Sequence, residues 1–97
     1  MTTPSFTRIE LSRNAQKDLS KLPFYIKDKL LLWIGTVERI GIRKARTIPG
    51  FHDEPLKGSR TGQRSIRLNR SYRAIYIEDQ RNEVHLIAII EVNKHEY

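Results

Sequence analysis

The residues best suited to chemistry lie in the second half of the chain, and the first of them are two neighbouring acids. Asp53 and Glu54 are the only acidic residues between positions 39 and 73, and they stand beside Pro55 and Lys57. A carboxylate held among cations stays ionised and can act as a general base. The same acids could instead do no more than neutralise nearby arginines, and the sequence leaves both interpretations open.

Two arginines are spaced so that they could hold one anion. If Asn69-Arg70-Ser71 is a three-residue loop, Arg67 and Arg73 lie opposite each other on neighbouring strands. Like charges directly across a ladder destabilise a sheet. The pair is therefore useful if an anion sits between the guanidinium groups, or tolerable if both groups reach into water.

The third group is the C-terminal tail. It brings four ionisable side chains and a terminal phenol together in the segment Glu91-Val92-Asn93-Lys94-His95-Glu96-Tyr97. A histidine can donate or accept a proton near neutral pH, and a tyrosine can stack on a base. Chain ends commonly fray and carry no function, but the apolar run 86–90 should tie this end to the sheet.

The positive charge of the chain is concentrated around these groups. The whole chain has 18 Lys and Arg against 11 Asp and Glu, a net charge of +7. Residues 39–73 alone hold ten basic and two acidic residues, a local charge of +8, and eight of the ten are arginines. Guanidinium groups match phosphate oxygens well. The concentration indicates a polyanion or an acidic protein as partner, with a plain solvated surface as the alternative.

Periodicity predicts the elements that must position these groups. Alternation indicates a strand over 6–11, Ser12 suits a helix N-cap, and Pro23 suits the first position of a second helix that ends at Gly41. The apolar stripe of this second helix places Trp33 in the core. The stretch 42–62 is predicted to be a long basic loop, because it is broken by prolines and glycines.

Three strand-like runs follow, over 63–69, 72–78 and 83–92, and they are joined by tight connections. The last run is nearly all apolar and indicates a central strand buried on both faces. We therefore predict one α+β domain over residues 1–97, with an N-terminal strand and a helical hairpin packed on a four-stranded, mainly antiparallel sheet. Tyr72 and Tyr76 should pack within this sheet, His85 should pack at an edge or in the core, and His52 should be exposed.

Composition limits the kind of protein further. The chain has no cysteine, so disulfides and thiolate metal sites are excluded. The longest nearly uncharged run, 30–37, is too short to cross a bilayer. Nothing in the first residues is typical of a signal peptide. A cytoplasmic protein without membrane contact is expected.

Several of these motifs, taken in order, resemble one known family. The segments are 54–58 (EPLKG), 62–69 (GQRSIRLN), 72–76 (YRAIY) and the ending 95–97 (HEY). Together they resemble the RelE/ParE toxin superfamily, and within it the RelE-, YoeB- and HigB-like messenger RNA interferases. The resemblance is detailed from Glu54 onward and covers the N-terminal helical hairpin in outline.

The resemblance implies a role for each residue of a ribonuclease site. Glu54 corresponds to the catalytic base of the family, and Arg73 and Arg67 correspond to groups that stabilise the phosphate charge. His95 corresponds to the acid, and Tyr97 corresponds to a residue that orients the scissile nucleotide. Base and acid could be exchanged between Glu54 and His95. The sequence departs from the YoeB-like ending, because Glu96 separates the histidine from the tyrosine, which makes the assignment of Tyr97 less direct.

The implied reaction needs no metal or other cofactor, because the 2′-hydroxyl of RNA attacks the neighbouring phosphorus. Lys57 and Arg64 are expected to grip phosphate, and the RNA-binding set is completed by Arg60, Arg70 and Lys94. The implied function is that of a toxin of a type II toxin–antitoxin system, which cuts messenger RNA in the ribosomal A site, in contact with 16S ribosomal RNA. The implied protein partner is an acidic antitoxin that covers Arg64, Arg67 and Arg73 or displaces the tail.

Two other functions stay open. A ParE-like inhibitor of DNA gyrase would share the fold but needs no acid–base pair, so the Glu54 segment and the His95 tail favour the nuclease. A non-catalytic RNA-binding module is also compatible with aromatic residues among basic strands.

Overall fold

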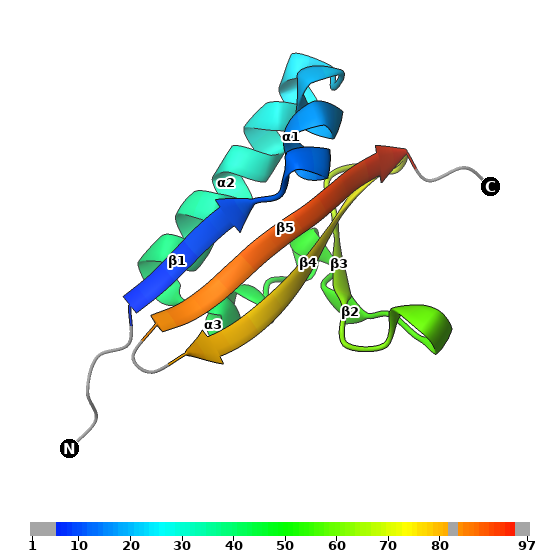
Figure 1. The fold of residues 1–97 in the computed structure, drawn as a ribbon. Coiled ribbons are helices and arrows are strands. Elements are labelled where there is room, and N and C mark those ends of the chain that lie inside the picture. Colours follow the sequence, from blue (N-terminus) through cyan, green and yellow to red (C-terminus); the bar gives the residue numbers. More distant parts are fainter. Residues whose placement is uncertain (1–5, 82–83, 95–97) are drawn as a thin grey trace.

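A five-stranded mixed sheet is the centre of the molecule (Figure 1). The structure is a computed structural model, and it describes residues 6–81 and 84–94. The strands run in the spatial order β1-β5-β4-β3-β2; β1 is parallel to β5, and the other neighbouring pairs are antiparallel. In chain order the elements are β1 (Phe6–Leu11), α1 (Arg13–Ser20), α2 (Phe24–Ile40), α3 (Ile42–Ala45), η1 (Pro49–Phe51), β2 (Glu54–Pro55), η2 (Gly58–Arg60), β3 (Arg64–Arg67), β4 (Tyr72–Arg81) and β5 (Val84–Lys94).

Helix α1 is fixed to the sheet by polar contacts at both of its ends. The Ser12 hydroxyl accepts a hydrogen bond from the Ala15 amide, as an N-cap should, and donates one to the carbonyl of Ile90 in β5. Two residues before the helix ends, the Asp18 carboxylate accepts a hydrogen bond from the amide of Val92. Helix α1 therefore lies along β5 beyond the point where β1 ends.

Helix α2 supplies most of the helical contribution to the core. It begins one residue later than predicted, since Pro23 is the N-cap and not the first helical residue. It ends at Gly41, which adopts φ 86° and ψ 160°, a conformation open to glycine. The predicted buried stripe is confirmed at Trp33, whose ring lies 5.1 Å from that of Tyr76 in β4, centroid to centroid.

The prediction of one long basic loop over 42–62 is wrong. This stretch holds one short helix, two 3-10 turns and the two-residue strand β2, which pairs Glu54 with Ser65 and Pro55 with Arg64 of β3. The sheet therefore has five strands and not the four predicted. A two-residue strand is too short to show periodicity, and its pairing partner lies nine residues or more away.

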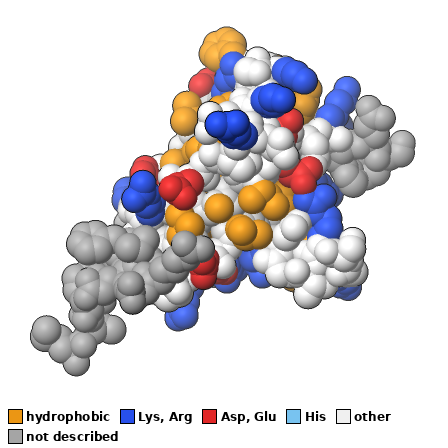
Figure 2. All heavy atoms as spheres, viewed as in Figure 1, with side chains coloured by type: hydrophobic (Ala, Val, Ile, Leu, Met, Phe, Trp, Pro, Cys, Tyr) orange, Lys and Arg blue, Asp and Glu red, His pale blue; other side chains and the backbone are white. Residues whose placement is uncertain are grey.

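Strand β5 lies inside the sheet, as predicted, but only one of its faces is fully buried. Ile87, Ile89 and Val92 are buried under the helices, while Leu86 and Ala88 on the other face are half-buried. That second face, the open face, is not covered by a helix. Figure 2 shows apolar side chains at its middle and charged ones around them.

No helix among the described residues is long and apolar enough to cross a membrane.

Candidate functional site

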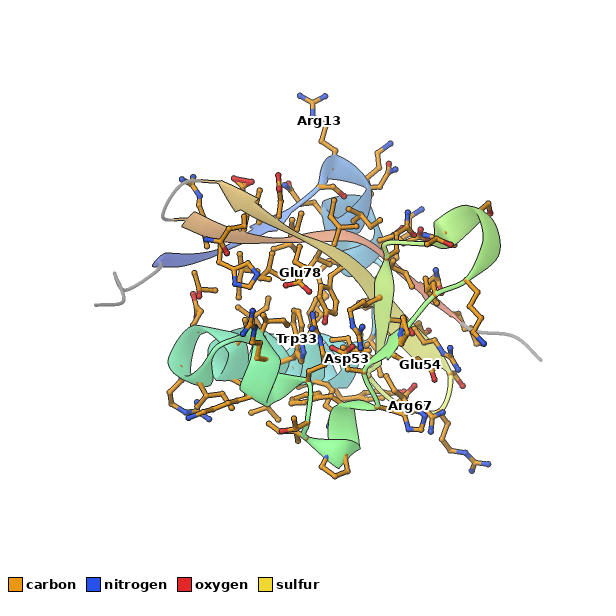
Figure 3. The ribbon with its side chains drawn as sticks, turned by 90° about the horizontal axis from the view of Figure 1, so that it is seen from below. Arg13, Trp33, Asp53, Glu54, Arg67 and Glu78 are labelled. Carbon is orange, nitrogen blue, oxygen red and sulfur yellow. The ribbon has the colours of Figure 1, made fainter. Side chains whose placement is uncertain are left out.

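The two neighbouring acids point to opposite faces of the sheet. The Asp53 side chain is 0% exposed, whereas that of Glu54 is 46% exposed. Just before them, His52 adopts a left-handed backbone conformation with φ 49°. Because side chains alternate along extended chain, Asp53 enters the core side and Glu54 emerges on the open face. Figure 3 shows Asp53 on the Trp33 side of this segment and Glu54 beyond it.

Asp53 anchors the segment to two other strands. Its Oδ1 accepts a hydrogen bond of 2.6 Å from Nε of Arg64, and its Oδ2 accepts one of 2.5 Å from the Tyr76 hydroxyl. Burial and the contact with Asp53 both raise the pKa of Tyr76 well above its ordinary value, so the phenol keeps its proton and donates it to the carboxylate. Asp53 thus neutralises an arginine, which is one of the two roles left open by the sequence.

Glu54 faces a cation instead of a buried donor. Its Oε1 lies 3.7 Å from Nη1 of Arg73, and its Oε2 lies 4.0 Å from Nε2 of His52. His52 is exposed, as predicted, but the structure brings its imidazole within reach of the candidate base, which sequence reasoning did not anticipate. The carboxylate is accessible, and it lies beside both a guanidinium group and an imidazole.

Arg67 and Arg73 are directly opposite each other in the β3–β4 pairing. Arg73 is in turn opposite Asn93 of β5. The strand alternation puts these three side chains and Glu54 on the open face, where the Glu54 carboxylate lies beside Arg73 and Arg67 stands opposite Arg73. We call Glu54, Arg67 and Arg73 the open-face cluster. It carries a net positive charge and suits an anion.

Two of the predicted RNA-binding arginines already have acidic partners. Arg64 is held by Asp53, and Arg60 forms an ion pair with Glu91 on β5. The hydrogen bond from Arg60 lowers the pKa of Glu91 against the opposing effect of burial, and Asn93 adds a further donor at 2.8 Å. Arg60 therefore fixes the η2 turn against the sheet.

The other predicted positions lie around the cluster or outside the described residues. Lys57 and Arg70 are exposed, in the η2 segment and the β3–β4 turn, and Lys94 is exposed at the end of β5, opposite Tyr72. His95 and Tyr97 lie outside the described residues. The last described residue pair, Lys94 with Tyr72, adjoins the pair of Asn93 with Arg73.

A second ionic cluster, which the sequence gave no local reason to expect, joins α3 to the β4–β5 hairpin. Arg46 and His85 both contact Glu78, the latter at 2.8 Å. Burial alone would raise the pKa of Glu78, but hydrogen bonds from Arg46 and His85 lower it below the ordinary value. His85 thus makes a hydrogen-bonding contact between strands in addition to its packing.

A hollow of about 270 Å³ opens beside Glu54 on its His52 side. It is slightly smaller than typical small-molecule sites, which run from about 300 to 1,000 Å³. Its walls come from the α3–β2 segment: Arg46, Thr47, Ile48, Pro49, His52, Asp53 and Glu54.

Comparison with known proteins shows which solved structures share this fold. No family model and no curated protein sequence matches the chain. Among solved structures, it is similar to a YoeB/ParE toxin from Agrobacterium tumefaciens, with a TM-score of 0.72 and 17% identity over 92% of this chain and 99% of that one. It is similar to the YoeB dimer of Staphylococcus aureus, with a TM-score of 0.68 and 23% identity over 96% of this chain and 100% of that one.

A third similar structure is the archaeal RelE–RelB complex of Pyrococcus horikoshii, with a TM-score of 0.68 and 24% identity over 92% of this chain and 94% of that one. At these identities the likeness establishes the fold. The chain has the α+β fold of the RelE, YoeB and ParE toxins, which confirms the predicted fold class.

Proposed function

We propose, from the fold shared with YoeB and RelE toxins, that this chain is the toxin of a type II toxin–antitoxin pair and an endoribonuclease that cuts messenger RNA on the ribosome. The observation that carries the proposal is the open-face cluster. A carboxylate that is 46% exposed lies 3.7 Å from Arg73, and Arg67 stands directly opposite Arg73. This set combines a proton acceptor with two charge stabilisers.

The cluster suits cleavage by the RNA's own 2′-hydroxyl. Glu54 takes the proton from that hydroxyl, whose oxygen attacks the adjacent phosphorus. The guanidinium groups of Arg73 and Arg67 offset the negative charge that builds on the phosphorane. The bond from phosphorus to the 5′-oxygen breaks, an acid protonates that oxygen, and the products are a 2′,3′-cyclic phosphate and a 5′-hydroxyl end.

Two histidines compete for the role of the acid. The resemblance assigns it to His95, with Tyr97 orienting the nucleotide, and both lie in the tail that follows β5. His52 is the alternative, because its Nε2 lies 4.0 Å from Glu54 at the rim of the 270 Å³ hollow. Separate His95→Ala and His52→Ala variants decide between them. The variant that lacks the true acid should cleave RNA more slowly than the wild type on the acidic to neutral side of the pH profile. The other variant should keep the wild-type pH profile.

The surplus of positive charge fits RNA as substrate and the ribosome as the platform. Arg60 and Arg64 are paired with acids, so we assign phosphate contacts first to the exposed Lys57, Arg70 and Lys94. Contacts of this kind weaken steeply as salt rises. An acidic antitoxin would cover the same open face, and the RelE of Pyrococcus horikoshii was solved as a complex with RelB.

The test is a purified translation reaction with a defined message, in which cut ends are mapped with and without ribosomes. Glu54→Gln and Arg73→Ala should each lower the cleavage rate by about 10²–10³-fold. Arg13→Ala is the matched control, since this exposed arginine lies on α1, away from the cluster (Figure 3), and should leave cleavage unchanged.

Unchanged cleavage by both cluster variants would refute the site. If the protein blocked DNA supercoiling by gyrase and left the message intact, the gyrase-inhibitor alternative would replace the nuclease as the proposed function. RNA binding without any cut end would leave only a binding module.

A further inference from the structure

Strand β5 contains a β-bulge near its end, and this bulge changes the face to which the last residues of the strand point. In the pairing with β4, Ile89 and Glu91 are opposite neighbouring residues, so Ile90 between them is an extra residue. An extra residue of this kind can re-aim the side chains beside it. Ile89 and Val92, three positions apart, are accordingly both buried. In a regular strand Glu91 would share the buried face of Ile89, because alternate side chains share a face.

The bulge instead brings Glu91 and Asn93 to the open face. Asn93 is opposite Arg73 of the open-face cluster, and Glu91 comes two residues before it. Nδ2 of Asn93 donates a hydrogen bond of 2.8 Å to Oε2 of Glu91. The other carboxylate oxygen, Oε1, accepts a hydrogen bond from Nη2 of Arg60, which belongs to the turn between β2 and β3. Glu91 therefore joins that turn to the strand that carries the neighbour of Arg73.

The 56–63 turn, which contains η2, depends on this contact for its position. Its ends are joined by a hydrogen bond from the amide of Leu56 to the carbonyl of Gln63, and none of its side chains belongs to the buried core. In Figure 1 it projects beyond the β2 edge of the sheet. In the part of the chain that the structure describes, Arg60 has the only side chain of this turn that forms a hydrogen bond or ion pair outside it. The contact between Arg60 and Glu91 therefore sets where the turn lies relative to the open face.

The same turn carries one of the cations assigned to RNA. Lys57 is exposed and forms no ion pair with the described residues. Its ammonium group is a point charge on a flexible stem, so its contact with a phosphate depends on where the backbone of the turn is held.

We propose that Glu91 is a positioning residue for the RNA substrate. By holding Arg60, it fixes the 56–63 turn along the open face and keeps Lys57 where it can reach a phosphate of RNA bound at the open-face cluster. The inference rests on the proposed function, and it adds a residue that touches neither the substrate nor the reacting atoms.

Charge alone makes the opposite prediction. Glu91 is an acid on a face that binds a polyanion, so its removal would strengthen RNA binding if only net charge mattered. The geometry argues against this outcome, because the guanidinium group of Arg60 is held at two points. Its Nε donates a hydrogen bond of 2.7 Å to the side chain of Gln63, and its Nη2 contacts Glu91. The sign of the effect on substrate binding therefore separates positioning from simple electrostatics.

Steady-state cleavage of a defined message on ribosomes, with kcat and KM measured separately, tests this sign. Glu91→Ala should raise KM about three- to fivefold, as expected for the loss of an exposed charge contact, and should leave kcat within about twofold of the wild type. Lys57→Ala should raise KM by a similar factor. The double variant Lys57→Ala/Glu91→Ala should raise KM no further than Lys57→Ala alone, because a positioning residue has no effect once the group that it positions is gone.

Glu78→Ala is the matched control. Glu78 is also held by an arginine, Arg46, and by a second side chain, His85 at 2.8 Å, and its side chain is 33% exposed against 30% for Glu91. It lies beside α3 on the helix side of the sheet, so its removal should leave both KM and kcat at the wild-type values. Trp33 fluorescence shows that each variant is folded.

A charge swap provides the second measurement. Glu91→Arg places two guanidinium groups side by side and should raise KM although it adds positive charge, whereas Arg60→Glu/Glu91→Arg restores the pair and should return KM to within about twofold of the wild type. A lower KM in Glu91→Ala would show that Glu91 competes with RNA for Arg60, and would overturn the inference. So would an additive effect in the Lys57→Ala/Glu91→Ala variant, an equal rise of KM in the control, or a swap that fails to recover.

The two proposals fail in different ways. An active wild type whose KM is unaffected by Glu91→Ala refutes the positioning role alone. A wild type that leaves the message intact refutes the proposed function and, with it, the role of Glu91.

Discussion

Asp53 and Glu54 are adjacent in sequence, yet replacing them should affect different properties of the protein. Asp53→Ala removes a fully buried carboxylate that accepts hydrogen bonds from Arg64 at 2.6 Å and from Tyr76 at 2.5 Å. A hydrogen bond to a charged group is worth about 1.5–3 kcal/mol. Removing one partner of a buried pair costs about 3–5 kcal/mol, and Arg64, whose side chain is 22% exposed, would lose the acid that neutralises it.

We therefore expect Asp53→Ala to lower the free energy of unfolding by about 3–5 kcal/mol, a large share of the roughly 5–15 kcal/mol that stabilises a small domain. Urea denaturation followed by Trp33 fluorescence measures this change, because Trp33 is buried against Tyr76. For a domain of this size each 1 kcal/mol corresponds to about 4–8 °C in melting temperature, so the loss should also be plain in a thermal scan.

Glu54→Ala is the matched control. This neighbouring carboxylate is 46% exposed and its contact with Arg73 is 3.7 Å long, which makes it a surface pair worth about 1 kcal/mol or less. Tyr76→Phe provides the intermediate case, because it removes the hydroxyl donor and keeps the ring, and should cost about 1–2 kcal/mol. If Asp53→Ala were no more destabilising than Glu54→Ala, the assignment of Asp53 as the anchor of this segment would be wrong.

Two further predictions concern the core and the ionic contacts. Trp33→Ala should cost about 3–5 kcal/mol in unfolding free energy, whereas Trp33→Phe should cost much less, because the buried indole Nε1 has no hydrogen-bond partner among the described residues. The carboxyl groups of Glu78 and Glu91 have pKa values lowered from 4.5 in the folded protein, so the unfolded chain binds more protons in acid. The stability that these two carboxylates contribute is complete above about pH 4.5 and is lost as the pH falls through their lower folded pKa values. Thermal scans should therefore show a melting temperature that decreases as the pH is lowered from 4.5. In the Glu78→Gln/Glu91→Gln double variant this decrease should be smaller.

The sequence predicted the long elements because their signals are local. The Ser12 cap, the apolar stripe that buries Trp33 and the stop at Gly41 each depend on residues within a few positions of one another. The pairing of Arg67 with Arg73 could also be predicted from the sequence, since the short turn between them sets the register of the two strands. The structure confirms all of these features.

The contacts that shape the site could not be predicted from the sequence, because their partners are far apart in the chain. Asp53 meets Tyr76 across 23 positions, and Arg60 meets Glu91 across 31. No periodicity links such pairs, and only the folded sheet brings them together. The composition of 39–73 therefore overstated the free positive charge, because four of its ten basic residues, Arg46, Arg60, Arg64 and Arg73, are paired with acids.

The alternation of side chains across the sheet connects these observations. Along the segment 53–55 and β3, one face carries the anchor formed by Asp53 and Arg64, and the other carries Glu54 and Arg67. A slip of one residue in the β2–β3 register would move Glu54 into the core and Asp53 onto the surface. Such a slip buries a carboxylate away from Arg64, so the strength of the anchor also fixes where Glu54 points. The buried ion pair on the core side thus sets the geometry of the charged cluster on the open face. Weakening the Asp53–Arg64 pair should make the distance between Glu54 and Arg73 more variable before the fold is lost.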